Sequence, residues 1–190
     1  MVNYVIDNIA SSKVLDVPNH STNSGVQIDQ WTDNGGLNQQ WDLVDAGNGL
    51  VKIVNVENKK VLKVRAAQTV NGTAVEQSTD APGDPSQLWK ITNFRHGQVQ
   101  IFSALGSNNV LDIPGGNASD GVGAQIWDNV SVASESWALI MTDVKILNSI
   151  TGEVMDLPGF NTTDGTVIGQ WDDNGGANQR WRFYPIDVGQ

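Results

Sequence analysis

The chain has 190 residues, of which 39% are hydrophobic and 17% charged, with 20 glycines. This composition is typical of one folded, turn-rich domain and excludes a disordered chain. The formal net charge of −10, without any cluster of Lys or Arg, argues against nucleic acid and anionic membranes as main partners. The chain has no cysteine, which excludes disulfides and thiolate metal sites.

The first residues, MVNYVIDNIASSKVLDV, lack the charged start, apolar run and cleavage site of a secretion signal. No stretch approaches the roughly 20 apolar residues of a membrane-spanning helix. We therefore expect a soluble protein that is cytoplasmic or released without a signal peptide.

Short strands are predicted along the whole chain. Residues 4–8 and 14–17 alternate or group apolar residues as half-buried strands do, and residues 144–147 repeat this pattern. Asn-Gly-Gly follows Trp31 and again follows Trp171, and these residues accept the positive φ of a tight turn. No segment carries a sustained helical apolar stripe, so the sequence predicts an all-β protein.

Four internal repeats account for this pattern. Residues 25–41 (GVQIDQWTDNGGLNQQW) match residues 165–181 (GTVIGQWDDNGGANQRW), and KVLDVP and EVMDLP precede them. Two further copies end at Trp137 and, in the weakest copy, at Trp89. The four closing tryptophans, Trp41, Trp89, Trp137 and Trp181, are 48, 48 and 44 residues apart. The repeats span about 1–48, 49–96, 97–142 and 143–190.

The combination of Leu-Asp-Val, a mid-repeat aromatic and a closing Asn-Gln-x-Trp resembles the repeat of ricin B-type lectins. The resemblance covers nearly the whole chain and implies a β-trefoil. We predict a β-trefoil-like, pseudo-symmetric barrel, one domain over residues 1–190, built from four repeats of about 45 residues with four short strands each.

A β-trefoil has three repeats, so the fourth needs a place. Four units could close a wider barrel. Alternatively, three form the trefoil and the fourth packs outside it or pairs with another chain, because one unit cannot bury its own apolar face. Repeat two could also be a degenerate insertion. We expect one closed body of all four, because each copy keeps its closing Trp and its apolar strands.

A sugar pocket needs a flat aromatic face for the C–H groups of the ring, and a carboxylate and an amide for its hydroxyls. The resemblance implies that the Asp of Leu-Asp-Val, the mid-repeat aromatic and the Asn before Gln-x-Trp form this pocket, supported by the adjacent Gln. Repeats one and four are complete, whereas repeat three ends in Ser134-Glu135 in place of Asn-Gln. The candidate residues are Asp16, Trp31, Asn38 and Gln39 in repeat one, Asp156, Trp171, Asn178 and Gln179 in repeat four, and Asp112, Gln125 and Trp127 in repeat three.

Repeat two separates ligand contacts from scaffold. It has Lys63 for the Asp and Ser78 for the aromatic, so both main contacts are lost together, as a shared ligand pocket predicts. A turn-capping role for the Asp residues remains the alternative. The closing tryptophans persist in all repeats and are predicted to be core, with Gln39, Gln87 and Gln179 holding backbone groups. His20 and Phe160 share a loop position that either rims the pocket or is plain loop.

No catalytic or metal-binding residues are predicted. The acidic pairs recur in turn-forming contexts, and the chain has two histidines, no cysteine and no Gly-x-Ser-x-Gly. The resemblance implies a multivalent, metal-independent lectin without a cofactor. Its expected partners are galactose- or N-acetylgalactosamine-containing glycans of glycoproteins or glycolipids, with no nucleic acid and no membrane insertion; a homo-oligomer is left open. The alternatives are a trefoil-type protease inhibitor or protein-binding scaffold, and a carbohydrate-binding module of a glycosidase.

Overall fold

The computed structural model describes residues 3–183 apart from residues 94, 96 and 107. Repeat one contains β1 (Asn3–Asn8), β2 (Lys13–Asp16), η1 (Pro18–His20), β3 (Asp29–Trp31), η2 (Leu37–Gln39) and β4 (Trp41–Gly47), where η denotes a 3-10 turn. Repeat two contains β5 (Leu50–Asn55), β6 (Val61–Val64), η3 (Arg65–Ala67), β7 (Thr73–Ser78), η4 (Pro85–Gln87) and β8 (Trp89–Asn93).

Repeat three contains β9 (Val99–Ser103), β10 (Asn109–Asp112), η5 (Pro114–Gly116), β11 (Val122–Gly123), β12 (Gln125–Asp128), η6 (Ala133–Glu135) and β13 (Trp137–Val144). Repeat four contains β14 (Val154–Asp156), η7 (Pro158–Phe160), β15 (Gly169–Trp171), η8 (Ala177–Gln179) and β16 (Trp181–Phe183). None of the described residues forms a helix that is long and apolar enough to cross a membrane.

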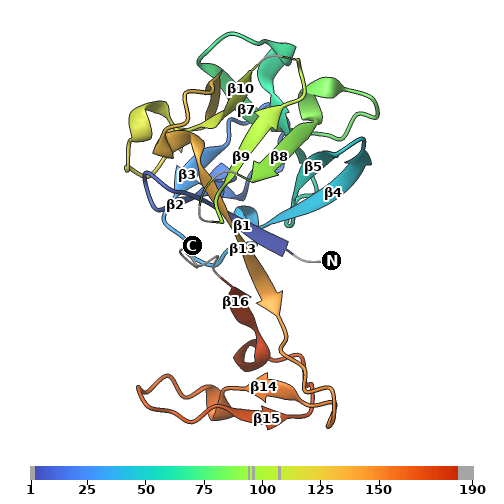
Figure 1. The fold of residues 1–190 in the computed structure, drawn as a ribbon, viewed down its shortest axis with the longest axis vertical. Coiled ribbons are helices and arrows are strands. Elements are labelled where there is room, and N and C mark those ends of the chain that lie inside the picture. Colours follow the sequence, from blue (N-terminus) through green and yellow to red (C-terminus); the bar gives the residue numbers. More distant parts are fainter. Residues whose placement is uncertain (1–2, 94, 96, 107, 184–190) are drawn as a thin grey trace.

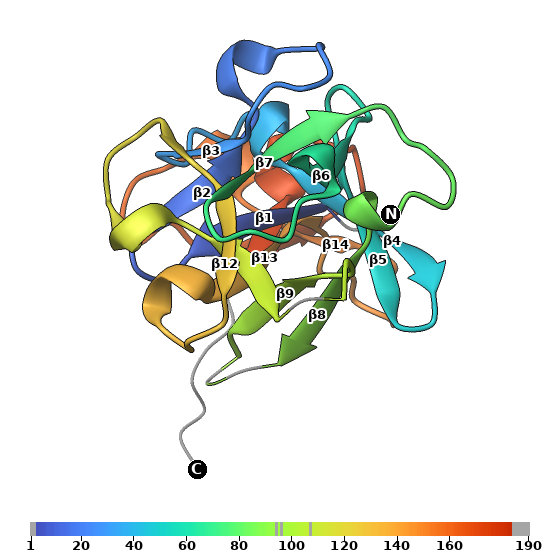
Figure 2. The same ribbon diagram turned by 90° about the horizontal axis from the view of Figure 1, so that it is seen from above.

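The first three repeats form a trefoil. Their outer strands pair in a closed ring, in the order β1, β4, β5, β8, β9 and β13, and β13 pairs back with β1. The inner strands form three hairpins, β2–β3, β6–β7 and β10–β12, which are arranged around the barrel in Figure 2. The prediction of an all-β, trefoil-like fold made of repeats is confirmed. We call this three-repeat unit, residues 3–144, the trefoil body.

The core of the trefoil body uses the same five positions of each repeat. These side chains, all fully buried, are Ile6, Leu15, Val17, Ile28 and Trp41; Ile53, Leu62, Val64, Val75 and Trp89; and Ile101, Leu111, Ile113, Ala124 and Trp137. Each closing Trp also donates its indole N–H to the carbonyl oxygen of the buried Leu of its own repeat, at 3.0–3.1 Å. The three tryptophans are therefore core residues, as predicted.

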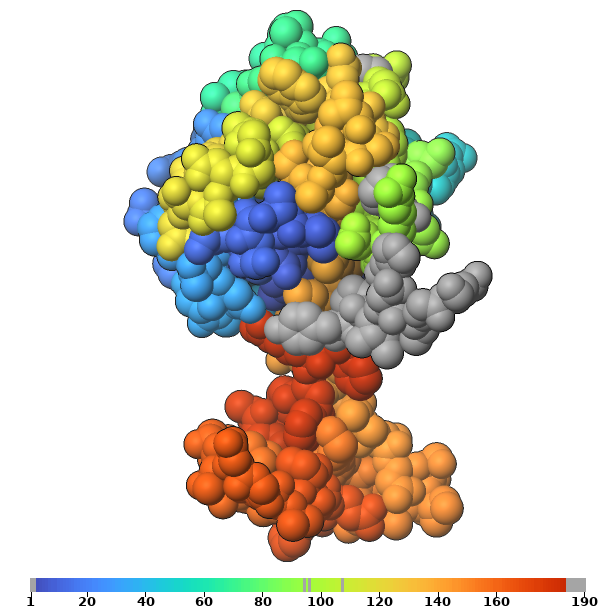
Figure 3. All heavy atoms as spheres, turned by 60° about the vertical axis from the view of Figure 1, so that its left-hand side comes forward, coloured from blue at the N-terminus to red at the C-terminus, as the bar shows by residue number. Residues whose placement is uncertain are grey.

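The fourth repeat lies outside the trefoil body. Its strands β14 and β15 form a separate two-stranded sheet, and only β16 joins the main sheet, along the end of β13. Figures 1 and 3 show this part, coloured orange to red, projecting from the body. We call residues 145–183 the fourth module.

The expectation that all four repeats close one body is therefore wrong, and the arrangement with three repeats in the trefoil and one outside is the one observed. The reason is the pairing of β13 with β1, in which Trp137 lies opposite Asn8 and closes the ring without a place for another strand. Trp181 accordingly departs from the core prediction. Its indole N–H still donates to the Met155 carbonyl oxygen at 3.1 Å, but the side chain is only half-buried.

Candidate functional site

Three cavities occupy the same place in repeats one, three and four, and we call them site 1, site 3 and site 4. Each is bounded by the Asp of the second strand, the mid-repeat Trp and the turn before the closing Trp. Their volumes are about 240 Å³ for site 1, 400 Å³ for site 3 and 530 Å³ for site 4. Every cavity therefore coincides with a predicted set of residues.

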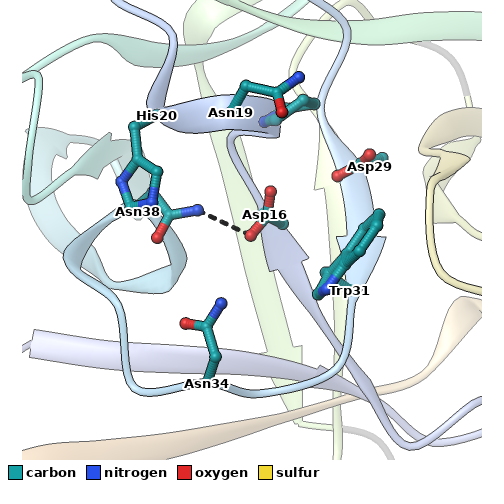
Figure 4. Close-up of a pocket in the computed structure, with 8 residues that line it drawn as sticks. Asp16, Asn19, His20, Asp29, Trp31, Asn34 and Asn38 are labelled. Carbon is teal, nitrogen blue, oxygen red and sulfur yellow. Dashed lines mark hydrogen bonds between the residues drawn. The ribbon is translucent and has the colours of Figure 1, made fainter.

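Strand register explains why the Asp and the Trp face the same cavity. In site 1, Asp16 lies directly opposite Asp29, and Trp31 is two residues further along the same strand. Cross-strand partners share a face of the sheet, and residues two apart share it as well. Figure 4 shows Asp16 between Asn38 on one side and Asp29 and Trp31 on the other.

In site 1 the closing turn orients the carboxylate. The Asn38 amide donates to Asp16 Oδ1 at 2.8 Å and to the Val17 carbonyl at 3.2 Å. The Gln39 amide lies behind it, donating to the Thr32 carbonyl at 3.1 Å while its oxygen accepts the N–H of Asn34 at 2.9 Å. The structure thus places Asn38 in the pocket and Gln39 as a support of the loop that lines it.

Site 4 repeats this network. Asn178 donates to Asp156 Oδ2 at 2.8 Å, and Gln179 donates to the same oxygen at 2.9 Å. Gln179 also donates to the Asp172 carbonyl at 2.9 Å and accepts the N–H of Asn174 at 3.0 Å. All four predicted residues of each complete set are therefore brought together in their own repeat.

The Asn-Gly-Gly turn serves the site through close approach. Gly35 has a φ of +77°, which favours glycine. Gly36 has an ordinary φ, but a Cβ there would overlap the Asn38 Oδ1 atom. Gly176 stands in the same relation to Asn178. The second glycine therefore allows the pocket Asn to pack against the turn.

The residues after the Asp rim the cavities. His20 lines site 1 and Phe160 lines site 4, which confirms the rim position for this loop. The Nδ1 atom of His20 contacts the Glu57 carboxylate at 3.0 Å. The mid-repeat tryptophans are exposed, at 43% for Trp31, 40% for Trp127 and 65% for Trp171.

Site 3 keeps the arrangement with different residues. Gln125, opposite Asp112 in the hairpin, donates to Asp112 Oδ2 at 2.8 Å and supplies the amide that Asn supplies elsewhere. Glu135 takes the supporting role of Gln, accepting the N–H groups of Val130 at 3.0 Å and Val132 at 3.3 Å. Site 3 has Ser134 in place of the pocket Asn, and Gln125 on the opposite side of the cavity replaces the missing amide.

Repeat two keeps the scaffold and lacks the pocket contacts. Gln87 accepts the N–H of Ala81 and donates to the Thr79 carbonyl, both at 2.8 Å. Lys63 stands in the Asp position, with its ammonium 3.3 Å from Asp84 Oδ2. Ser78 lies opposite Val61, just as each mid-repeat Trp lies opposite the equivalent Val of its own repeat. The loss predicted for this repeat agrees with this geometry.

Asp29 is a pocket residue that the motif did not identify. It is buried, lines site 1 beside Asp16, and its Oδ1 has no hydrogen-bond partner among the described residues. Burial, and then repulsion by Asp16, raise the pKa of Asp29 from 3.8 to about 7. Burial also raises the pKa of Asp16. The residues at the position of Asp29 in the other repeats are Glu76, Gln125 and Gly169, so this position differs in every repeat. The sequence feature that could have identified Asp29 is its position two residues before Trp31.

No metal centre is apparent in the part of the chain that the structure describes, because it contains no group of three or more His, Asp and Glu placed to hold an ion. The polar groups of the cavities are carboxylates and amides, which suit the hydroxyls of a neutral polar ligand.

The model of the ricin-type β-trefoil lectin domain-like family matches residues 2–78, 38–127, 85–171 and 133–189, so that the matches overlap along the chain. The chain belongs to this family. Carbohydrate binding is the function that this family membership supports, and the predicted resemblance to ricin B-type lectins is confirmed.

Solved structures agree with membership in the ricin-type lectin family. The designed threefold symmetric protein ThreeFoil is 32% identical, with 72% of this chain and 96% of that chain covered and a TM-score of 0.70. The exo-β-1,3-galactanase 1,3Gal43A from Clostridium thermocellum is 37% identical, with coverage of 73% and 30% and a TM-score of 0.70. The Macrolepiota procera ricin B-like lectin in complex with lactose shares the fold at 22% identity, with coverage of 72% and 93% and a TM-score of 0.63. A share of 72–73% corresponds in length to the trefoil body.

Proposed function

We propose that the protein is a multivalent, metal-independent lectin, without catalytic activity, that binds galactose- or N-acetylgalactosamine-containing glycans through sites 1 and 4, with site 3 as a further site. One observation carries the proposal. An oriented Asp beside an exposed Trp recurs in three repeats, and both residues are replaced together in repeat two. A shared ligand predicts this joint loss, whereas a role in folding does not.

The geometry suits a monosaccharide. The indole face covers the C–H groups of one ring face, the carboxylate accepts from adjacent hydroxyls, and the pocket amide fixes the carboxylate in direction. Galactose fits this arrangement because its axial 4-hydroxyl leaves the opposite face free for stacking. Each cavity is open to solvent along its exposed Trp, so single sites should be weak and avidity should dominate on glycan-bearing surfaces.

The similar proteins support galactose as the sugar. One of them is a ricin B-like lectin in complex with lactose, another is an exo-β-1,3-galactanase, and an earthworm R-type lectin is in complex with N-acetylgalactosamine. These are properties of those proteins. For this chain, the recurrence of one polar set in three places also favours binding over hydrolysis, because hydrolysis requires one dedicated pair of carboxylates.

A glycan array with wild type and the Asp16→Ala/Asp156→Ala variant tests the proposal, with Lys63→Ala in repeat two as a matched control. We expect wild type and Lys63→Ala to bind terminal galactose or N-acetylgalactosamine equally, with or without a chelator, and the double variant to lose most of the signal. An absence of wild-type binding to all glycans, or unchanged binding by the double variant, would contradict the site assignment. Dependence on a metal would contradict the mechanism.

A further inference from the structure

The fourth module presents the core face of a trefoil repeat without the neighbours that cover it. Five positions are fully buried in each repeat of the trefoil body. In the fourth module, the same positions are not buried; they are occupied by Ile146, Met155, Leu157, Ile168 and Trp181. Ile146 is 38% exposed and Ile168 is 40% exposed. A single unit of about 40 residues cannot bury such a face by itself.

The trefoil body shows what covers this face. Around its centre, Ile28 N–H donates to the Val75 carbonyl at 2.9 Å, Val75 N–H to the Ala124 carbonyl at 3.0 Å, and Ala124 N–H to the Ile28 carbonyl at 2.8 Å. Each repeat donates to one neighbour and accepts from the other, and in the trefoil body this ring contains three repeats. Head-to-tail contacts close a ring when the rotation between copies allows it, and the rotation of this contact closes the ring after three copies.

A second ring joins a glycine of each repeat to the residue before the mid-repeat position of the next. The three bonds run from Gly25 N–H to the Gln77 carbonyl at 2.8 Å, from Gly72 N–H to the Ile126 carbonyl at 2.9 Å, and from Gly121 N–H to the Gln30 carbonyl at 2.8 Å. All three glycines have a φ of +78° to +84°, and Gly165 of the fourth module has +86°. The fourth module therefore retains the conformation for this contact.

These glycines also complete the sugar sites. A Cβ at Gly121 would lie 3.6 Å from the Trp31 ring, and one at Gly72 would lie 3.8 Å from the Trp127 ring, so each Trp is backed by a neighbouring repeat. Gly165 has nothing within 4 Å of the same position. Trp171 is correspondingly the most exposed of the three, and site 4 lacks a wall that sites 1 and 3 have.

We propose that the fourth modules of three chains assemble into a second trefoil, which makes the protein a threefold-symmetric trimer. Ile168 of each chain takes the place of Ile28, and Gly165 N–H donates to the Gln170 carbonyl of the next chain while backing its Trp171. Each copy of site 4 is thus completed by a neighbouring chain.

Two details of the fourth module fit this assembly. The pairing of β16 with the end of β13 is already that of a trefoil repeat, because Val144 lies opposite Trp181 as Tyr4 lies opposite Trp41. In the trefoil body, Gly116 of repeat three lies close to Ala10 of repeat one. The residues at these two positions of the fourth module are Phe160 and Ile150, respectively. Ile150 is 92% exposed, and the assembly would place it beside Phe160 of a neighbouring chain.

Charge at the seam opposes the association. In the trefoil body, Asp120 accepts the N–H of Thr32 at 2.8 Å and pairs with Lys13 at 3.0 Å. In the fourth module, Asp164 takes the position of Asp120. In the trimer it would face Asp172 and Glu153 of the next chain, which take the positions of Thr32 and Lys13. These carboxylates lie at the surface, where salt screens them. The trimer should therefore strengthen as ionic strength rises, in contrast to an assembly held by ion pairs.

Sedimentation velocity of the 190-residue chain without sugar, from about 1 to 100 µM at two salt concentrations, tests this proposal. We expect the 20.5 kDa chain to convert into a species of three times that mass, more completely at higher salt. Ile168→Lys should abolish the trimer and leave the melting temperature of the trefoil body unchanged. Val70→Lys, an equally drastic change at an exposed residue of the body, should leave the trimer intact.

A single 20.5 kDa species at every concentration, a dimer, an open-ended series of masses, or full assembly of Ile168→Lys would overturn the proposal. Because mass is measured without sugar, failure here is independent of the lectin assignment.

Discussion

Repeats one and four have closely similar motifs and lie in different surroundings. In both, the pocket Asn donates to the Asp at 2.8 Å, although Trp41 is fully buried and Trp181 is only half-buried. The hydrogen bonds that orient the pocket Asp are made within one repeat, whereas the core requires three. The binding pocket and the fold thus depend on different parts of the same short sequence.

Removal of the closing Trp separates the two repeats most strongly. Trp41→Ala should lower the free energy of unfolding of the trefoil body by about 3–5 kcal/mol, because it leaves a large cavity and an unpaired Leu15 carbonyl. Trp181→Ala should leave the body unchanged, because Trp181 lies outside its core. Denaturant unfolding of both variants provides the test, and equal losses would show that the fourth module is part of the body's core.

Removal of the pocket carboxylate should affect both repeats alike. Asp16→Ala and Asp156→Ala should each weaken binding at their own site by about 10- to 100-fold, as expected for hydrogen bonds to a charged acceptor. Calorimetric titration with galactose, using backgrounds in which the other two Asp residues are already replaced, isolates each site. If one variant retains full affinity, the two sites are not equivalent.

The glycine behind the pocket Asn gives a smaller effect. Gly36→Ala should displace Asn38 from Asp16 and weaken site 1 by about tenfold, or about 1.4 kcal/mol. Gly169→Ala is the control, because Gly169 lines site 4 but the nearest atom to its new Cβ is Pro158 Cγ at 4.0 Å, and we expect little change there. The same galactose titrations measure both, and an unchanged affinity of Gly36→Ala would refute the close-approach argument.

The acidic pair of site 1, Asp16 and Asp29, adds a pH dependence to stability, and site 4 has Gly169 in place of Asp29. The pKa of Asp29 is about 7 in the folded protein, whereas the ordinary value for an Asp in an unfolded chain is 3.8. The folded state therefore binds more protons between these values, and stability falls as pH rises from about 4 to 7. Asp29→Asn should raise the melting temperature at pH 8 by about 2–4 °C and give no gain at pH 4.

Asp120→Asn is a control of opposite sign. Its hydrogen bond and ion pair with Lys13 lower the pKa of Asp120, so this substitution should cost stability at neutral pH and nothing at low pH. Melting curves that move in the same direction for both variants would contradict the assignment of the Asp29 pKa to burial and repulsion.

Much of each site could be predicted from the sequence because its residues belong to a motif of fixed spacing within one repeat. Asp16, Asn38 and Gln39 meet through local turns and one hairpin. Asp29 was missed because its place opposite Asp16 depends on strand register, which the motif does not contain. The hydrogen bond from Gln125 to Asp112 could not be predicted for the same reason, because it too depends on strand register. Gln125 itself was identified as a candidate residue.

The place of the fourth repeat could not be predicted because all four repeats carry equivalent core residues. Ile168 is as apolar as Ile28, and local sequence does not decide which three repeats pack together. That choice is made by the pairing of β13 with β1, which lie far apart in the sequence.

Fluorine NMR of protein labelled with 5-fluorotryptophan would detect sugar binding at the mid-repeat tryptophans. The chain has seven tryptophans, so seven resonances are expected, which single Trp→Phe variants would assign. Titration with N-acetylgalactosamine should shift the resonances of Trp31, Trp127 and Trp171 and leave those of Trp41, Trp89, Trp137 and Trp181 in place. A spectrum in which no resonance moves, or in which only the closing tryptophans move, would contradict the account.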